Sequence, residues 1–189
     1  MAMPALPDLA AFGPYLPAAA LAGFPDDGNR YEVVYGELLV SPSPSNRHQG
    51  VLEALSLALG TYGRQAGSAA VRYAPLRIEV GPDTAVEPDL IVIPQALAGQ
   101  VERYRLDQLL LVAEVLSPST ARADRFAKRR LYQEAGIPTY WIVDHEAACV
   151  EVWAPGARFP VVVRDRLTWQ APGAAEPVVL ELAALFTLA

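Results

Sequence analysis

The sequence predicts an α/β (α+β) fold in which helices flank a mixed β-sheet. Two segments carry apolar residues at helical spacing, and several short apolar runs of strand length lie between Gly- and Pro-rich turns. One of these runs, residues 108–116, is apolar at almost every position, which is typical of a central strand covered on both faces. We therefore expect helices on both sides of the sheet.

The first part of the chain divides into a lead, a hairpin and a helix. Residues 1–29 form a Pro- and Ala-rich lead that we expect to pack as short helical pieces on the body, whereas residues 30–189 form one domain. Two short apolar segments, 31–35 and 38–40, predict a hairpin. A Ser- and Pro-rich turn then provides an N-cap for a helix over 47–65.

The rest of the chain adds strands and a second helix. The Ser-Pro-Ser-Thr segment after residue 116 ends the central strand and caps a helix over 121–135, which Gly136 and then Pro138 terminate. The predicted strands are residues 70–73, 76–80, 85–93, 108–116, 139–143 and 149–153, with edge strands at 161–163 and 178–182 and a last short helix.

Composition and charge restrict the class of protein. The chain has 189 residues, 52% of them hydrophobic, and a formal charge of -6, so any phosphate-binding face must be local. The single cysteine, Cys149, excludes an intramolecular disulfide and a cysteine-based zinc site. Apolar stretches are too short to cross a bilayer and the N-terminus lacks a signal sequence, so we expect a cytoplasmic protein without a membrane partner.

Three charged side chains occupy positions whose neighbours predict burial. Asp89 and Glu114 lie within apolar runs, where an ionised carboxylate is costly unless a cation or hydrogen bonds compensate it. The only lysine, Lys128, shares its helix face with Leu131 and Tyr132 and therefore points towards the sheet. Because that helix begins just after the strand of Glu114, the ammonium can approach this carboxylate.

The chemistry of this set favours a divalent metal. The two carboxylates and the backbone carbonyl of Val115 form an oxygen-rich group of the kind that Mg²⁺ or Mn²⁺ prefers. A metal held in this way can activate a water molecule and neutralise charge on a phosphodiester, and a lysine ammonium can orient that water. The sequence therefore indicates metal-dependent phosphodiester hydrolysis.

The residues around these positions resemble a known family. The matching motifs are Pro88-Asp89, the segment 114–120, Asp124, Lys128, Tyr132, Gly136 and the segment 140–144, preceded by 30–32, 36–38, 41–44 and Arg47-His48. They resemble the Uma family of putative restriction endonucleases, of the PD-(D/E)XK nuclease superfamily. The resemblance implies a restriction-endonuclease-like fold, DNA cleavage, metal ligation by Asp89 and Glu114, and a homodimer.

The resemblance also brings a departure and further candidates. Superfamily members carry a lysine two residues after the second acid, but Leu116 occupies that position, and Lys128 is the implied replacement. Additional metal candidates are Glu37, Glu53 and His48, the last of which is also suited to a capping bond or a phosphate contact. The candidate phosphate-binding residues are Arg122, Arg125 and Arg129, which a solvated helix face explains almost as well.

Two other functions are compatible with these residues. A catalytically inactive binding or assembly module with the nuclease fold is indicated by the acidic pI of about 4.9 and by the displaced lysine. Glycoside hydrolysis also uses two carboxylates, but it leaves the inward Lys128 unexplained. Structural roles remain as alternatives for the single residues: a turn cap for Asp89, and an ion pair between Glu114 and Lys128.

Overall fold

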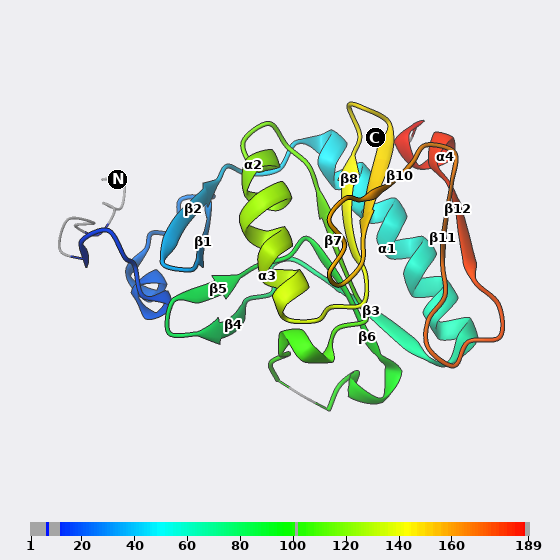
Figure 1. Cartoon of the computed structure of the whole chain (residues 1–189), viewed down its shortest axis with the longest axis horizontal. Coiled ribbons are helices and arrows are strands. Elements are labelled where there is room, and N and C mark those ends of the chain that lie inside the picture. The colour runs from blue at the N-terminus through cyan, green and yellow to red at the C-terminus, as the bar shows by residue number, and fades with distance from the viewer. Residues whose placement is uncertain (1–6, 8–11, 101, 188–189) are drawn as a thin grey trace.

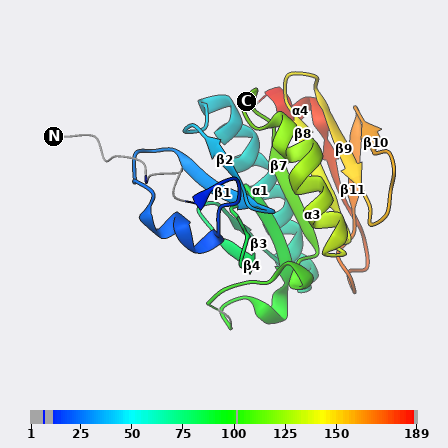
Figure 2. The same cartoon turned by 60° about the vertical axis from the view of Figure 1, so that its left-hand side comes forward.

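A six-stranded mixed sheet forms the centre of the molecule, with α1 on one face and α2 and α3 on the other (Figures 1 and 2). The computed structural model describes residues 7, 12–100 and 102–187, so residues 1–6 and 8–11 of the predicted lead lie outside the described residues. Within the described part of the lead, Leu16 and Leu21 are buried against the hairpin residues Tyr31 and Val33.

The elements follow the predicted order closely. The helices are α1 (Asn46–Ala66), α2 (Ala121–Ala123), α3 (Arg129–Glu134) and α4 (Leu182–Thr187), with a π-helical segment (Asp124–Lys128) between α2 and α3 and short 3-10 turns at Ala18–Gly23, Gln95–Leu97 and Leu106–Gln108. The strands are β1 (Arg30–Val34), β2 (Glu37–Ser41), β3 (Ala69–Tyr73), β4 (Ile78–Gly81), β5 (Thr84–Val86), β6 (Leu90–Pro94), β7 (Leu111–Val115), β8 (Tyr140–Asp144), β9 (Cys149–Trp153), β10 (Val161–Val163), β11 (Arg166–Trp169) and β12 (Val178–Glu181).

The strands form three sheets among the described residues. The central sheet has the order β10-β9-β8-β7-β6-β3, in which β7 and β8 are parallel and the other neighbours antiparallel. A smaller antiparallel sheet, β2-β1-β5-β4, lies beside it, and β11 and β12 form a ribbon at the other side (Figure 1). The predicted mixed sheet with helices on both faces is confirmed, while β11 was not predicted.

The side chains of β7 alternate between the two helical layers, as the pleat of a strand requires. Leu111, Ala113 and Val115 pack in the same core as α1, whereas Val112 packs with residues of α3. Glu114 lies two residues after Val112 and therefore on the same face of the strand. It points into the layer that contains the π-helical segment. The strand therefore carries an acid on the face towards Lys128, as its sequence pattern predicts.

The predicted strand 85–93 is wrong, because the chain breaks at Glu87-Pro88-Asp89. Pro88 has no N–H to give to a sheet, and the chain passes here from β5 in the small sheet to β6 in the central sheet. The predicted helix 121–135 exists, but a π-helical segment interrupts it. The break leaves Asp89 at the junction of the two sheets, one residue before β6.

Gly63 of α1 lies close to the backbone of β3. A Cβ atom at Gly63 would lie 2.4 Å from the backbone oxygen of Ala69. We expect Gly63→Ala to destabilise the fold by roughly 1–3 kcal/mol, because this backbone must shift. Gly60→Ala on the same helix is the control, since its Cβ would meet only the end of a flexible side chain at 3.5 Å. Denaturant unfolding should separate the two variants, and equal stabilities would contradict the prediction.

Candidate functional site

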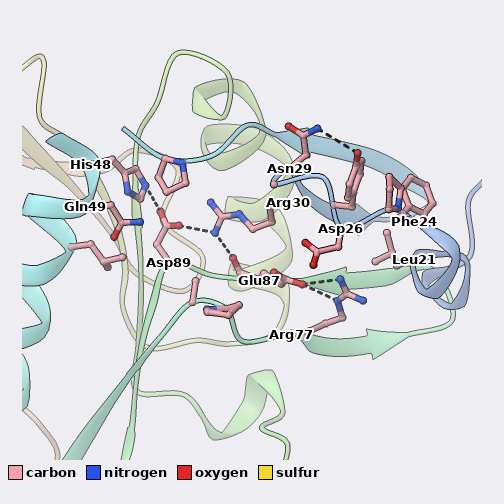
Figure 3. A pocket seen from close by; sticks show the side chains of 17 residues that line it. Leu21, Phe24, Asp26, Asn29, Arg30, His48, Gln49, Arg77, Glu87 and Asp89 are labelled. Atoms are coloured by element: carbon pink, nitrogen blue, oxygen red, sulfur yellow. Dashed lines mark hydrogen bonds and ion pairs between the residues drawn. The ribbon is translucent and has the colours of Figure 1, made fainter. Parts of the chain in front are cut away.

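Asp89 is a buried carboxylate, 3% exposed, with partners on both oxygens. Its Oδ1 accepts a hydrogen bond from Arg30 Nη1 at 2.7 Å. Its Oδ2 accepts from the Val115 N–H at 2.9 Å and lies 3.1 Å from His48 Nε2. Burial alone would raise the pKa of Asp89, but the hydrogen bond from His48 and the charge of Arg30 outweigh it and hold this pKa below its ordinary value. Figure 3 shows Arg30 and His48 approaching Asp89 from opposite sides.

Glu114 is buried next to Asp89 and is 1% exposed. Its Oε1 accepts hydrogen bonds from Lys128 Nζ at 3.2 Å and from Tyr132 Oη at 3.1 Å, and its Oε2 accepts from the Asp89 N–H at 3.2 Å. Burial raises the pKa of Glu114 well above its ordinary value, although Lys128 opposes this effect. The carboxylate of Asp89 accepts a hydrogen bond from the backbone next to Glu114, and the carboxylate of Glu114 accepts one from the backbone of Asp89. These two bonds fix the carboxylates relative to each other.

Lys128 is enclosed by carboxylates. Its Nζ lies 2.8 Å from Glu32 Oε2, 3.2 Å from Glu114 Oε1 and 3.5 Å from Asp124 Oδ1, and the residue is 2% exposed. Burial alone would lower the pKa of Lys128, but these three carboxylates outweigh it and raise the pKa well above its ordinary value. The π-helical segment begins at Asp124 and ends at Lys128, and it directs both side chains into the site.

The charges of this buried group do not balance. It contains four carboxylates and two permanent cations: Glu32, Asp89, Glu114 and Asp124 with Arg30 and Lys128. If all four carboxylates were ionised, they would exceed the two permanent cations by two charges in the interior, where isolated charge is costly. Burial also raises the pKa of Asp124. Either protons or a divalent cation must neutralise the excess.

The residues fit a hydrated divalent ion better than a closed metal cage. Among the described residues, no three His, Cys, Asp or Glu side chains form a metal-binding group. However, Asp89 Oδ1 and Glu114 Oε2 each accept one hydrogen bond from the described residues, which leaves each a lone pair. Mg²⁺ is commonly held by one or two carboxylates and keeps several waters.

Two cavities that share wall residues lie beside this group; Asp89 and Arg30 line the first, and Arg30 alone of the group lines the second. The first, which we call the Asp89 cavity, has a volume of about 500 Å³ and is lined by Asp89, Arg30 and His48 together with residues of the lead (Figure 3). The second, which we call the Arg47 cavity, has a volume of about 510 Å³. The two cavities share Arg30, Pro44 and His48 in their walls.

The other predicted metal candidates lie apart from this group, with one exception. The ring of His48 contacts Asp89, and the backbone N–H of His48 donates to the hydroxyl of Ser45, the N-cap of α1, at 3.2 Å. Glu37 and Glu53 are exposed and line separate hollows. Among these three candidates, the structure therefore brings His48, but neither Glu37 nor Glu53, to Asp89. The Val115 carbonyl stays a predicted ligand.

The three candidate phosphate-binding arginines line neither cavity. Arg125 forms ion pairs with Asp144 at 2.9 Å and Glu151 at 2.7 Å. Arg129 lies over the ring of Trp153, 4.8 Å from its centroid, and donates to the Arg125 carbonyl. Arg122 is exposed. Two of these three guanidinium groups are thus engaged in holding the helix to the sheet.

Sequence reasoning assigned no role to several residues of the site, two of which, Arg30 and Glu32, lie on β1. Arg30 binds Asp89, and Glu32 binds Lys128 and also accepts the Glu87 N–H at 2.7 Å. A signal for Glu32 was available, because it interrupts the apolar residues of the predicted hairpin as Asp89 and Glu114 interrupt their strands. For Arg30 only its spacing, two residues before Glu32 and hence on the same strand face, indicated a shared role.

The fold and the site together define a protein of the restriction-endonuclease-like class: a mixed sheet flanked by helices, with two buried acids at adjacent strands and a lysine beside them. A family model described as Uma2, putative restriction endonuclease, matches residues 19–183, and the chain belongs to this family. The predicted family is thereby confirmed.

One solved structure supports the same fold. A putative nuclease belonging to DUF820 from Anabaena variabilis is 18% identical, with a TM-score of 0.74 over 92% of this chain and 98% of that chain. A comparison with curated proteins gave no match. Among the described residues, no helix is long and apolar enough to cross a membrane.

Proposed function

We propose that this chain hydrolyses phosphodiester bonds in DNA and that it requires Mg²⁺ or Mn²⁺ for this activity. The observation that carries the proposal is the pair of buried carboxylates, Asp89 and Glu114, each of which accepts a hydrogen bond from the backbone at or next to the other, beside a cavity that Asp89 lines. Membership of a family described as putative restriction endonuclease supports a nuclease activity. The predicted donor set of Asp89, Glu114 and the Val115 carbonyl would hold the ion.

The bound ion would supply Lewis-acid activation of water and neutralise charge on the phosphate. The protein's own residues orient the ligands. Arg30 and His48 fix the two oxygens of Asp89, while Tyr132 and Lys128 fix one oxygen of Glu114. Such fixed partners hold ligands in place and tune their basicity.

Lys128 acts on Glu114 in this proposal. Its ammonium favours the ionised form of Glu114, which is the form that binds a metal. Lys128 lines a small hollow of about 130 Å³ with Glu32 and Asp124, and it does not line the Asp89 cavity. For Lys128 to contact the attacking water, that water would therefore have to lie next to Glu114.

Supercoiled plasmid DNA is the substrate that tests the proposal. We expect the purified protein to convert it to nicked circles in millimolar Mg²⁺ or Mn²⁺, and EDTA to abolish this conversion. Single-stranded DNA and RNA oligonucleotides in the same assay would define the class of nucleic acid. A contaminating nuclease is excluded if Asp89→Asn, prepared in the same way, loses the activity.

Thermal unfolding gives a second measurement that is independent of cleavage. Mn²⁺ at a hundred-fold excess over its Kd should raise the free energy of unfolding by about 2.7 kcal/mol in the parent protein, and Asp89→Asn should lose most of this gain. Absence of both cleavage and metal-dependent stabilisation would refute the proposal. It would favour the inactive binding or assembly module.

A further inference from the structure

The walls of the Arg47 cavity are rich in hydrogen-bond donors. Two loops that are distant in the sequence form most of it: the Ser- and Pro-rich segment 41–45 before α1 and the segment 117–120 after β7. Each loop carries several hydroxyl groups, and Arg47 and His145 add nitrogen donors. A few polar groups at fixed positions in such a cavity can orient a bound group.

The imidazole ring of His145, which lines this cavity, has a buried nitrogen without a partner among the described residues. His145 is 8% exposed, and its Nδ1 makes no hydrogen bond within the described residues. Leaving such an atom unpaired costs about 1–3 kcal/mol, so an unmet donor or acceptor indicates a water or a ligand.

The electrostatics of the Arg47 cavity favour an anion. The cavity lies at the N-terminus of α1, a 21-residue helix whose first N–H groups have no partners inside the helix and carry partial positive charge. Arg47 is exposed and forms no ion pair with the described residues. Burial, and then the nearby charge of Arg47, lower the pKa of His145. Glu146 lines the same cavity and opposes an anion, but it is exposed.

We propose that the Arg47 cavity binds a backbone phosphate of the nucleic-acid strand whose neighbouring phosphodiester lies in the Asp89 cavity. This inference rests on the proposed function, and the shared wall of the two cavities carries it. A strand that lies across Arg30 and His48 would occupy both cavities at once. Arg47, His145 and the helix N-terminus would then fix the register of the strand relative to Asp89 and Glu114.

Binding of a labelled DNA duplex, measured by fluorescence anisotropy in EDTA at several salt concentrations, tests the subsite without cleavage. We expect Arg47→Gln to weaken binding about fivefold or more and to reduce the salt slope by about one unit. Glu146→Gln should strengthen binding. Arg64→Gln is the control, because Arg64 is also exposed on α1, at its other end, and forms no ion pair with the described residues. Equal affinities for the Arg47 and Arg64 variants would overturn the proposal.

Further measurements separate this inference from the proposed function. Inorganic phosphate should shift the NMR signals of the His145 ring in the parent protein, and Arg47→Gln should abolish the shift. If the parent protein binds phosphate in this way but cleaves no nucleic acid, the subsite stands and the proposed function fails. If the parent protein cleaves DNA and Arg47→Gln leaves KM and affinity unchanged, the subsite alone fails. Weakening by Arg122→Gln in place of Arg47→Gln would also overturn it and would move the phosphate to the α2–α3 surface.

Discussion

Lys128→Met is expected to destabilise the protein by about 3–5 kcal/mol, the largest effect on stability that we predict. The ammonium is buried between Glu32, Glu114 and Asp124, so its removal leaves these three carboxylates without their common cation. Methionine fills a similar volume, and the loss therefore measures charge rather than packing. Thermal or denaturant unfolding of the metal-free proteins provides the comparison.

Two further variants define the cause of this loss. Arg130→Met removes an exposed cation from the same helix, where its ion pair with Glu134 is 2.7 Å long, and should change stability by less than about 1 kcal/mol. Combining Lys128→Met with Glu32→Gln should restore part of the loss, because one buried charge fewer is left unpaired. A Lys128 variant as stable as the Arg130 variant would contradict the prediction.

Glu114→Gln is expected to reduce cleavage by roughly 10³-fold, which corresponds to about 4 kcal/mol of lost transition-state stabilisation. The amide nearly preserves the shape of the side chain and its contact with Tyr132, but it removes the negative charge that would hold a metal. We expect kcat/KM for plasmid nicking to fall while far-ultraviolet circular dichroism stays unchanged.

A matched control keeps this second prediction specific. Asp107→Asn also removes one carboxylate charge, but from an exposed side chain that pairs with Arg105 outside both cavities. Its activity should equal that of the parent protein. If Glu114→Gln cleaves as fast as Asp107→Asn while both remain folded, Glu114 has no part in the chemistry.

Local signals predicted most elements of the fold. The hairpin, α1 and the central strand β7 each follow from apolar spacing and turn residues, which depend on few distant contacts. The division at Pro88 could not be placed in the same way. An apolar run does not tell which strand its backbone will pair with, so the second sheet was missed and the run was extended from β5 into β6.

The candidate site was predictable to the extent that charge interrupts an apolar pattern. Asp89, Glu114 and Lys128 were found in this way, and the structure brings Glu114 to both of the others. The proximity of Arg30 and Glu32 depends on the packing of the small sheet against the central one, which no local pattern encodes. The arginines of the second helix were a weaker prediction. A dense run of basic residues does not reveal that Arg125 already forms ion pairs within the protein.

The seam between the two sheets gives the hairpin a function beyond support. β1 contributes the guanidinium that holds Asp89 and the carboxylate that holds Lys128, whereas Asp89 and Glu114 are carried by the central strands. Detachment of this one hairpin would remove a partner from Asp89 and a partner from Lys128 in a single event. Any hydrolysis at this centre would thus be restricted to completely assembled molecules, and a nascent or partly unfolded chain would be unable to damage nucleic acid.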